Sequence, residues 1–230
     1  MEIAAITGLE AEARIARRAG FAARASGGIA VQTFEAAEAY LAQGAQTLLS
    51  FGIAGALAPH LAPGTLLLPR AVVEEGGVRR VVDAGWRSRL ADALTAAGLR
   101  AESGDLLGAD QAAASRARKA ELYAATGALA IDLESHIVAR SAARAGSAFV
   151  VLRAVADPAE RDLPPAALDG LDADGAPALG RVLHSVLRHP GQVLALLRLA
   201  SDTRRALLAL RAAFDQRPDV ASAQMRRLVR

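Results

Sequence analysis

The sequence predicts an α/β protein, a three-layer αβα sandwich around a central mixed β-sheet, with further helices at the C-terminal end. Three observations lead to this fold class. Short apolar runs alternate with helical patterns over the first 155 residues, which is typical of a largely parallel sheet. A glycine-containing turn joins two valine-rich runs, which predicts an antiparallel hairpin and so a mixed sheet. Two helical patterns without further strands follow.

The predicted elements can be justified one after another along the chain. Five apolar runs have the length of buried strands, namely Glu2–Thr7, Thr47–Phe51, Thr65–Leu68, Ala128–Leu133 and Ala148–Val155. Helical spacing of apolar residues predicts helices at Leu9–Ala19, Phe34–Gln43, Trp86–Ala97, Ala114–Ala124 and Ser135–Ala145. The hairpin pairs Val72–Val73 with Val78–Val82 across a Glu-Glu-Gly-Gly turn.

The segment after the last predicted strand differs from the rest of the chain. From Arg161 to Pro177, prolines, glycines and aspartates replace the periodic pattern, which predicts a loop or linker. Helices are predicted at Leu179–Arg188 and Gln192–Phe214, separated by a Pro-Gly pair. We therefore expect a main domain over residues 1–177 and a basic helical extension over residues 178–230.

Composition limits the class of protein. The chain has 230 residues, of which 53% are hydrophobic and 3% aromatic, and its formal net charge is +3. This content suffices for a substantial core and excludes a disordered chain. Because cysteine is absent, disulfides, thiolate metal sites and cysteine nucleophiles are excluded. The sequence shows neither a signal-peptide pattern nor eighteen consecutive apolar residues, so we expect a cytoplasmic protein without a membrane span.

Charge is distributed unevenly along the chain. Residues 178–230 contain ten arginines and three aspartates, a net charge of +7, whereas residues 1–177 carry −4. Leucines and arginines recur along the helix predicted at Gln192–Phe214, and two interpretations stay open. This helix lies on an anionic membrane surface, or it packs on its own domain or on a partner subunit. Nucleic-acid binding is not expected, because aromatic side chains for base stacking are almost absent.

Polar residues follow four of the predicted strands, where ligands gather in open α/β sheets. Gly52 and Gly55 follow one strand and allow backbone amides to approach a ligand, although an ordinary strand-to-loop turn explains them equally well. Glu12, Glu134 and Asp157 follow three others, where helix starts and an Asp-Pro turn also favour acids. Separated acids at one sheet edge can protonate a leaving group and position a nucleophile, which suits cleavage of glycosidic bonds.

Neither a metal site nor a serine hydrolase is expected. The four histidines have no ligand spacing with one another or with acids, and no Gly-x-Ser-x-Gly elbow occurs. We expect no metal and no organic cofactor.

Four motifs occur in order along about residues 1–160, namely Thr7–Glu12, Ser50–Leu57 with Pro63–Thr65, Ile131–Ser135 and Val151–Asp157. Together they resemble the nucleoside phosphorylase and nucleosidase superfamily, and within it the methylthioadenosine/adenosylhomocysteine nucleosidase type. The resemblance implies a phosphorylase/hydrolase-like catalytic domain over residues 1–177. It also implies cleavage of the N-glycosidic bond of an adenine nucleoside, by hydrolysis or phosphorolysis.

The resemblance assigns catalytic and sugar-binding roles to four residues. Asp157 matches the acid that protonates purine N7, and Glu12 matches the carboxylate that orients the attacking water. Glu134 matches the acid that binds the ribose hydroxyls, and Leu133 the apolar residue beneath the sugar.

Further matches concern the nucleophile and the base. Backbone amides on the nucleophile side would come from Gly52, Ile53, Ala54 and Gly55. Asp110 falls in the segment that meets the base. The aromatic residue that family members place after it is replaced here by Ala112 and Ala113, so this segment does not supply base stacking.

Two positions depart from the phosphorylases of this superfamily, which place an arginine before the glycine segment and a serine within it, both on phosphate. Ser50 and Ile53 stand there instead, and an isoleucine side chain cannot donate to phosphate. Glu12 would also repel a phosphate bound beside it. These features favour water as nucleophile, while Arg14 and Arg153 remain candidate partners for inorganic phosphate as a co-substrate.

A narrower resemblance is to the hopanoid-associated phosphorylase branch, which releases adenine from adenosylhopane. It rests on Asp132–His136, Ala156–Pro165 and the arginine-rich tail. The alternatives are a methylthioadenosine/adenosylhomocysteine-type nucleosidase and a non-catalytic nucleoside- or lipid-binding protein of the same fold. The resemblance further implies a homo-oligomer. A lipid-linked substrate would bring residues 178–230 to the inner face of the membrane.

Overall fold

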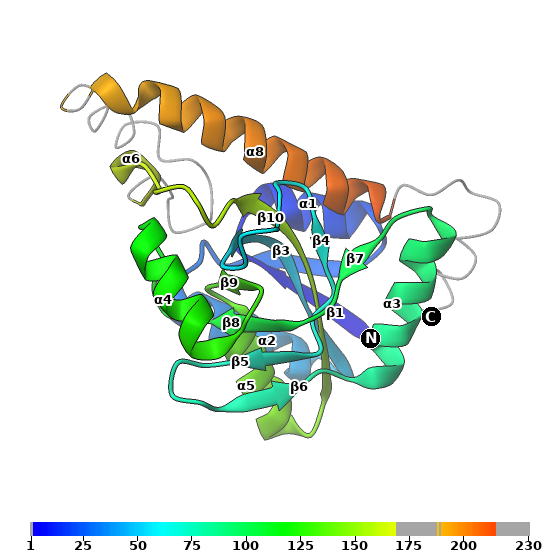
Figure 1. Ribbon diagram of the computed structural model, residues 1–230. Helices are drawn as coiled ribbons and strands as arrows, with labels where there is room; N and C mark the ends of the chain where they lie inside the picture. Colours follow the sequence, from blue (N-terminus) through cyan, green and yellow to red (C-terminus); the bar gives the residue numbers. More distant parts are fainter. Residues whose placement is uncertain (1, 169–187, 189, 215–230) are drawn as a thin grey trace.

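The computed structural model describes residues 2–168, 188 and 190–214, and it shows a central sheet with helices on both faces (Figure 1). Strands run both parallel and antiparallel to their neighbours. The predicted α/β class with a central mixed sheet is therefore confirmed.

Ten strands of the described residues form the sheet. They are β1 Ile3–Thr7, β2 Ala22–Ala25, β3 Thr47–Ala56, β4 Leu66–Leu67, β5 Ala71–Val73, β6 Arg79–Val81, β7 Ala101–Glu102, β8 Asp105–Gly108, β9 Ala130–Asp132 and β10 Ala148–Asp157. Their order across the sheet is β6-β5-β8-β9-β3-β10-β4-β7, and β1 lies between β3 and β2. The antiparallel pairs are β3 with β9, β4 with β10, and β5 with β6.

The helices and their ends follow from local sequence. They are α1 Glu10–Arg18, α2 Ala30–Ala42, α3 Ala84–Ala96, α4 Arg116–Thr126, α5 Ser135–Ala145, α6 Pro165–Leu168 and α8 Val193–Ala212, with a 3-10 turn η1 at Pro190–Gln192. Asp83 starts α3, because its Oδ1 accepts a hydrogen bond from the Trp86 amide at 2.8 Å. Gly127 and Gly146 end α4 and α5 with the positive φ that glycine adopts without strain.

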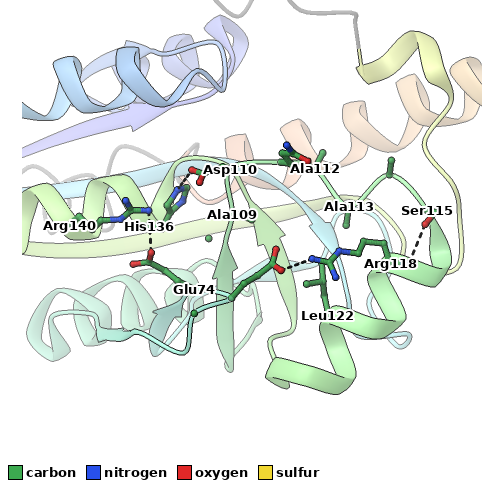
Figure 2. Close-up of a pocket in the computed structure, with 15 residues that line it drawn as sticks. Glu74, Ala109, Asp110, Ala112, Ala113, Ser115, Arg118, Leu122, His136 and Arg140 are labelled. Atoms are coloured by element: carbon green, nitrogen blue, oxygen red, sulfur yellow. Dashed lines mark hydrogen bonds and ion pairs between the residues drawn. The ribbon is translucent and has the colours of Figure 1, made fainter.

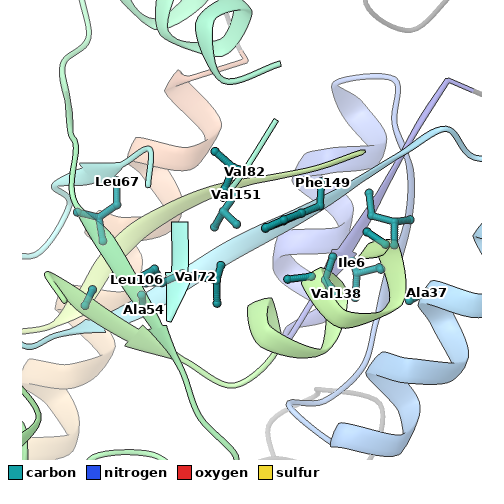
Figure 3. Packing of buried hydrophobic residues seen from close by; sticks show 14 of the residues in the cluster. Ile6, Ala37, Ala54, Leu67, Val72, Val82, Leu106, Val138, Phe149 and Val151 are labelled. Carbon is teal, nitrogen blue, oxygen red and sulfur yellow. The ribbon is translucent and has the colours of Figure 1, made fainter. Parts of the chain in front are cut away.

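The core consists of two main apolar layers, one on each face of the sheet. Because successive strand residues point to opposite faces, Phe149 and Val151 of β10 enter the layer that contains α2 and α5 (Figure 3). Val150 and Leu152 enter the layer that contains α1, α3 and α8. Helices on both faces explain why the strands are continuously apolar rather than alternating.

The sequence predicted most of these elements, but it placed the end of β3 wrongly. The five predicted strands, the hairpin and the five helices before Arg161 are present, with ends that differ by a few residues. The strand β3 does not end at Phe51, however, but runs through Gly52–Gly55 to Ala56. It does so because β10 pairs with it along this whole stretch. The glycine segment is therefore part of a strand and not a strand-to-loop turn.

Three short strands were not predicted, and β2 shows why. Its sequence, Ala-Ala-Arg-Ala, has neither an apolar run nor alternating bulky residues, so only pairing with β1 makes it a strand. The short helix α6 lies in the segment predicted as a loop. The predicted helix Leu179–Arg188 lies outside the described residues except for Arg188.

The predicted helix Gln192–Phe214 is present as α8, and it packs on the domain. It crosses the same face of the sheet as α1 (Figure 1). Its inward residues Ala206 and Leu210 are fully buried. After its last turn, Phe214 packs against Phe21 and Phe51, with ring centroids 5.5 and 5.4 Å apart. Among the described helices, none is both long and apolar enough to cross a membrane.

Candidate active site

The strand β3 extends past its neighbour β1, and charged side chains gather where the pairing ends. The strand β1 pairs with β3 as far as Ser50, and β9 pairs with it from Gly55 onwards. Between these points, a Cβ on Gly52 would lie 2.6 Å from Arg153 Nη1 and 2.7 Å from Glu12 Cδ. A glycine is required here because only a residue without a side chain leaves room for both charged groups.

Arg153 of β10 is the centre of a buried charge cluster. Its side chain is 1% exposed, and its Nη2 lies 2.5 Å from Asp132 Oδ2 and 3.0 Å from Glu134 Oε2. The same nitrogen donates to Ser50 Oγ at 2.7 Å, and Nη1 donates to the Ile53 carbonyl oxygen at 3.3 Å. One guanidinium thus holds side chains from β9, the start of α5 and β3 together. We call Arg153, Asp132, Glu134 and Glu12 the arginine cluster.

Glu12 joins the arginine cluster from α1. Its Oε2 accepts from the Leu9 amide at 2.7 Å, which caps the first turn of the helix. Its Oε1 accepts from the Ile53 amide at 2.8 Å. The backbone N–H in the middle of the glycine segment therefore already donates its hydrogen bond to Glu12.

Burial and like charges decide the protonation of the arginine cluster. Burial raises the pKa of Glu134 to about 7 against the attraction of Arg153, and Asp132 and Glu12 add to the rise. Burial also raises the pKa of Glu12. At Arg153, burial disfavours the charge, but the three carboxylates outweigh it and raise the pKa of the guanidinium. Three acids around one permanent cation therefore retain a proton close to neutral pH.

Asp157 ends β10, four residues after Arg153, and has a different partner. The register between β10 and β3 shifts between Val155 and Asp157, so that Asp157 lies opposite Gly55. Its Oδ2 accepts from Lys119 Nζ of α4 at 2.5 Å. Burial raises the pKa of Asp157, and Lys119 is the strongest opposing influence. A buried acid with a raised pKa is suited to hold a proton for a leaving group.

Leu133 directly follows β9, and Ala54 belongs to β3, so the strands that carry Asp132 and Gly52 also place these two residues. A Cβ on Gly28, in the turn after β2, would lie 3.6 Å from both Leu133 Cδ1 and Glu134 Oε1. Leu133 is thus half-exposed beside the Glu134 carboxylate. Ala54 points into the core layer under α2 and α5, so it offers only its backbone.

Asp110 lines a pocket of about 560 Å³ (Figure 2). Its Oδ1 lies 3.0 Å from His136 Nε2, and His136 stands in the first turn of α5. Arg140 and Glu74 form an ion pair on the same wall of this pocket. Ala112 and Ala113 line the pocket where the expected aromatic residue is missing. The pocket is bordered by the segments 74–76 and 108–115 and by α4 and α5.

The structure adds two residues that sequence reasoning did not assign to the site, Asp132 and Lys119. Asp132 contacts Arg153 and also accepts hydrogen bonds from the backbone amide and hydroxyl of Ser135. For Lys119 a signal existed, because it is the only lysine in a chain with 27 basic residues. Within the described part of the chain, no three histidine, aspartate or glutamate side chains are grouped as a metal site requires.

Comparison with known proteins assigns the chain to a family. The sequence profile of the phosphorylase superfamily matches residues 21–188, which is well over half of the chain. Glu12 lies before the matched range and α8 lies after it. No curated protein sequence matches the chain.

Solved structures share the fold at low sequence identity. The S-adenosylhomocysteine nucleosidase of Streptococcus pyogenes, in complex with 5-methylthiotubericidin, has a TM-score of 0.68 and 17% identity over 95% of this chain and 98% of that chain. A mutant nucleosidase of Helicobacter pylori with 5′-methylthioadenosine in its active site has a TM-score of 0.67 and 16% identity, covering 93% and 98%. Futalosine hydrolase of the same organism has a TM-score of 0.66 and 16% identity, covering 94% and 97%.

Proposed function

The chain belongs to the phosphorylase superfamily, and on this basis we propose that it cleaves the N-glycosidic bond of an adenine nucleoside. One observation carries the proposal: two separate acidic centres flank the glycine segment of β3. Asp157 lies opposite Gly55, and Glu12 and Glu134 lie around Arg153 near Gly52. Glycosidic cleavage requires such a separation, because one acid holds a proton for the leaving base while others hold the sugar and the nucleophile.

In the proposed reaction, Asp157 donates its proton to N7 of the adenine. The bond between N9 and C1′ breaks, its electron pair goes to the base, and the sugar acquires oxocarbenium character that nearby carboxylates stabilise. Glu134 binds the ribose hydroxyls, with Leu133 beneath the sugar. Glu12 orients the water that attacks C1′ and accepts the proton that this water loses as the new C1′–O bond forms. Asp110 lies on the side of the base.

We propose that water rather than phosphate is the nucleophile, for two reasons. A phosphate at the glycine segment would need the Ile53 amide, which already donates to the Glu12 carboxylate. It would also need a cation, but Arg153 is surrounded by the carboxylates of the arginine cluster. Placing a dianion beside these acids is electrostatically unfavourable. Inorganic phosphate as a co-substrate is therefore the second choice.

Adenine release from adenosine, 5′-methylthioadenosine, S-adenosylhomocysteine and adenosylhopane, with and without inorganic phosphate, tests the proposed reaction. We expect release without phosphate. The sugar product should be the free sugar rather than its 1-phosphate, namely ribose from adenosine and the 5′-substituted ribose from the other three nucleosides. Asp157→Asn should lower kcat by about 10²- to 10⁴-fold, because the amide cannot donate the acid's proton. Asp92→Asn, the same change at an exposed position of α3, should keep wild-type activity. Equal turnover of the two variants would contradict the assignment of Asp157.

Among adenine nucleosides, we propose adenosylhopane as the substrate. The support is the resemblance of Asp132–His136, Ala156–Pro165 and the arginine-rich tail to the hopanoid-associated branch. The alternative is a methylthioadenosine/adenosylhomocysteine-type nucleosidase. A kcat/KM for adenosylhopane in detergent micelles that exceeds the value for 5′-methylthioadenosine supports the proposal, and the reverse order supports the alternative.

A lipid-linked substrate suggests peripheral membrane contact, which we propose for the outward face of α8. Leu194, Leu197 and Leu208 are 58%, 63% and 53% exposed on a helix that also bears exposed arginines. An apolar stripe with basic residues is suited to the surface of an anionic bilayer. This proposal concerns only the outward face, because the inward face is buried in the core.

Flotation with vesicles of phosphatidylglycerol and phosphatidylcholine tests the membrane contact. We expect the wild type to float with these vesicles and Leu197→Glu/Leu208→Glu to stay behind. Val31→Glu changes an equally exposed residue of α2 and should float like the wild type. Flotation that is equal for all three proteins, or absent for the wild type, would contradict the proposal. The expected homo-oligomer is a separate prediction, which light scattering of the full chain tests.

A further inference from the structure

Lys119 of α4 is the only lysine of the chain, and it is buried to 1% exposure. Burying a cation is costly unless hydrogen bonds and an opposite charge compensate for the lost water. All other basic positions of this chain are arginines. The presence of lysine rather than arginine at this one position therefore needs a geometric explanation.

The reason lies in the three acceptors around Nζ. Lys119 donates to Asp157 Oδ2 at 2.5 Å, to the Pro158 carbonyl oxygen at 3.0 Å and to the Arg161 carbonyl oxygen at 2.7 Å. An ammonium has three donors, and each of them is used here. A planar guanidinium presents its donors as a flat fork, which does not match three acceptors grouped around one atom. Lysine thus fits this shell and arginine does not.

The turn that carries two of these acceptors is held by α8. The Arg161 guanidinium forms an ion pair with Asp202, whose side chain is 6% exposed on the inward face of α8. Arg205, one turn further along, approaches the other oxygen of Asp202 at 3.1 Å. The loop after β10, which contains this turn, also contacts the segment just before α4. The Leu163 amide donates a hydrogen bond to the Ala114 carbonyl oxygen at 2.8 Å.

We propose that Lys119 is a positioning residue that fixes the Asp157 carboxyl group, and that Arg161 and Asp202 connect the C-terminal helix α8 to this acid. This inference rests on the proposed function, since it concerns the acid of that reaction. One oxygen of the carboxyl group is anchored by Lys119, which leaves the other to face the base. The C-terminal helix is then part of the catalytic apparatus as well as of the core.

A consequence for pH dependence follows from the groups that face Asp157. They are Lys119 from α4, Arg161 from the loop after β10, and Asp202 from α8. Burial raises the pKa of Asp157, Lys119 and Arg161 lower it, and Asp202 raises it. Because the protonated acid is the active form, activity falls as pH rises through its pKa. Removing the Lys119 charge should move this fall to higher pH.

The pH profile of kcat/KM for Lys119→Met tests the proposal. We expect the basic limb to move up by about 1–3 pH units, the range over which a close opposite charge shifts an aspartate. At the optimum, kcat/KM should fall by about 10²-fold, because the acid is no longer held in place. Lys119→Arg keeps the positive charge and should leave the limb near its wild-type pH, but kcat/KM at the optimum should still fall, because a guanidinium does not match the three acceptors. Glu121→Gln, which removes an exposed charge from the same helix without touching the loop after β10, should change neither quantity.

Two outcomes would overturn the proposal: a loss of activity that is equal at every pH, or a limb that moves with Lys119→Arg as much as with Lys119→Met. If Lys119→Met does not fold, the half-exposed Arg161→Met should still move the limb upward by a smaller amount. A ¹³C NMR titration of the Asp157 carboxyl in wild type and Lys119→Met needs no turnover. If no nucleoside is cleaved, the proposed function fails, while an unmoved titration would refute the inference about Lys119.

Discussion

Arg153 and Asp157 stand four residues apart on β10, both buried, and their surroundings are opposite. Arg153 is a cation among three carboxylates, and its surroundings come from β3, β9 and the starts of two helices. Asp157 is a single acid beside one buried cation, and its surroundings come from α4 and from a loop that forms an ion pair with α8. The first region therefore has an excess of acids that cannot all be ionised, whereas the second has a matched pair. From this comparison we expect the first region to contribute most to stability while it holds the sugar-side acids, and the second to set the protonation of the catalytic acid.

The largest expected effect is on stability, when the arginine cluster loses its cation. Arg153→Met leaves Asp132, Glu134 and Glu12 buried without a partner and should lower the free energy of unfolding by about 3–5 kcal/mol. Denaturant titration measures this loss. Arg153→Lys keeps a charge and should lose less. If both variants unfold like the wild type, the cluster is not the structural centre of the site.

The next largest effect is the pH dependence of stability, which comes from Glu134. Its pKa is about 7 in the folded protein and 4.5 for the ordinary group, so folding favours the protonated form. Stability from this residue is fully present below pH 4.5 and is lost as the pH rises to about 7, by roughly 3 kcal/mol. Glu134→Gln should flatten the curve of unfolding free energy against pH in this window. A variant curve parallel to that of the wild type would contradict the raised pKa.

A smaller effect is expected from the glycine that separates the two regions. Gly52→Ala places a methyl group within 2.7 Å of Glu12 and Arg153, which should cost about 1–3 kcal/mol and displace the Glu12 carboxylate. Thermal unfolding and kcat together measure this change. Gly76→Ala is the matched control, because a Cβ there meets nothing within 4 Å. Equal stability of the two variants would show that the close approach at Gly52 is relaxed at little cost.

The smallest effect is expected at the link between the acid and α8. Asp202→Asn weakens the ion pairs to Arg161 and Arg205, both of which are partly exposed, so we expect a loss of about 1 kcal/mol. The basic limb of kcat/KM should also move to lower pH, because the Asp202 charge that raises the pKa of Asp157 is removed. Denaturation and the pH profile check these effects. A loss as large as that of Arg153→Met would remove the contrast between the two regions.

Sequence reasoning reached the secondary structure and the main acids, and it failed where pairing rather than local pattern decides. Glu12, Glu134 and Asp157 follow predicted strands, so their common sheet edge could be expected. The end of β3 was misplaced, because Gly52 and Gly55 resemble a turn until β10 pairs across them. The role of Asp110 on the side of the base stays a prediction, and the structure gives its surroundings, a pocket that α5 borders.

By itself, the sequence determined the longer strands and helices and which acids follow the strands, because these depend on neighbours only a few residues away, whereas β2 and the end of β3 needed their pairing partners. The tertiary structure decided which charges meet. Ile53 and Glu12 are 41 residues apart in the chain, Lys119 and Asp157 are 38 apart, and Arg161 and Asp202 are 41 apart. Such pairs arise from strand order, a register shift in β10 and the packing of α8, and each is enforced by the cost of burying a charge without a partner.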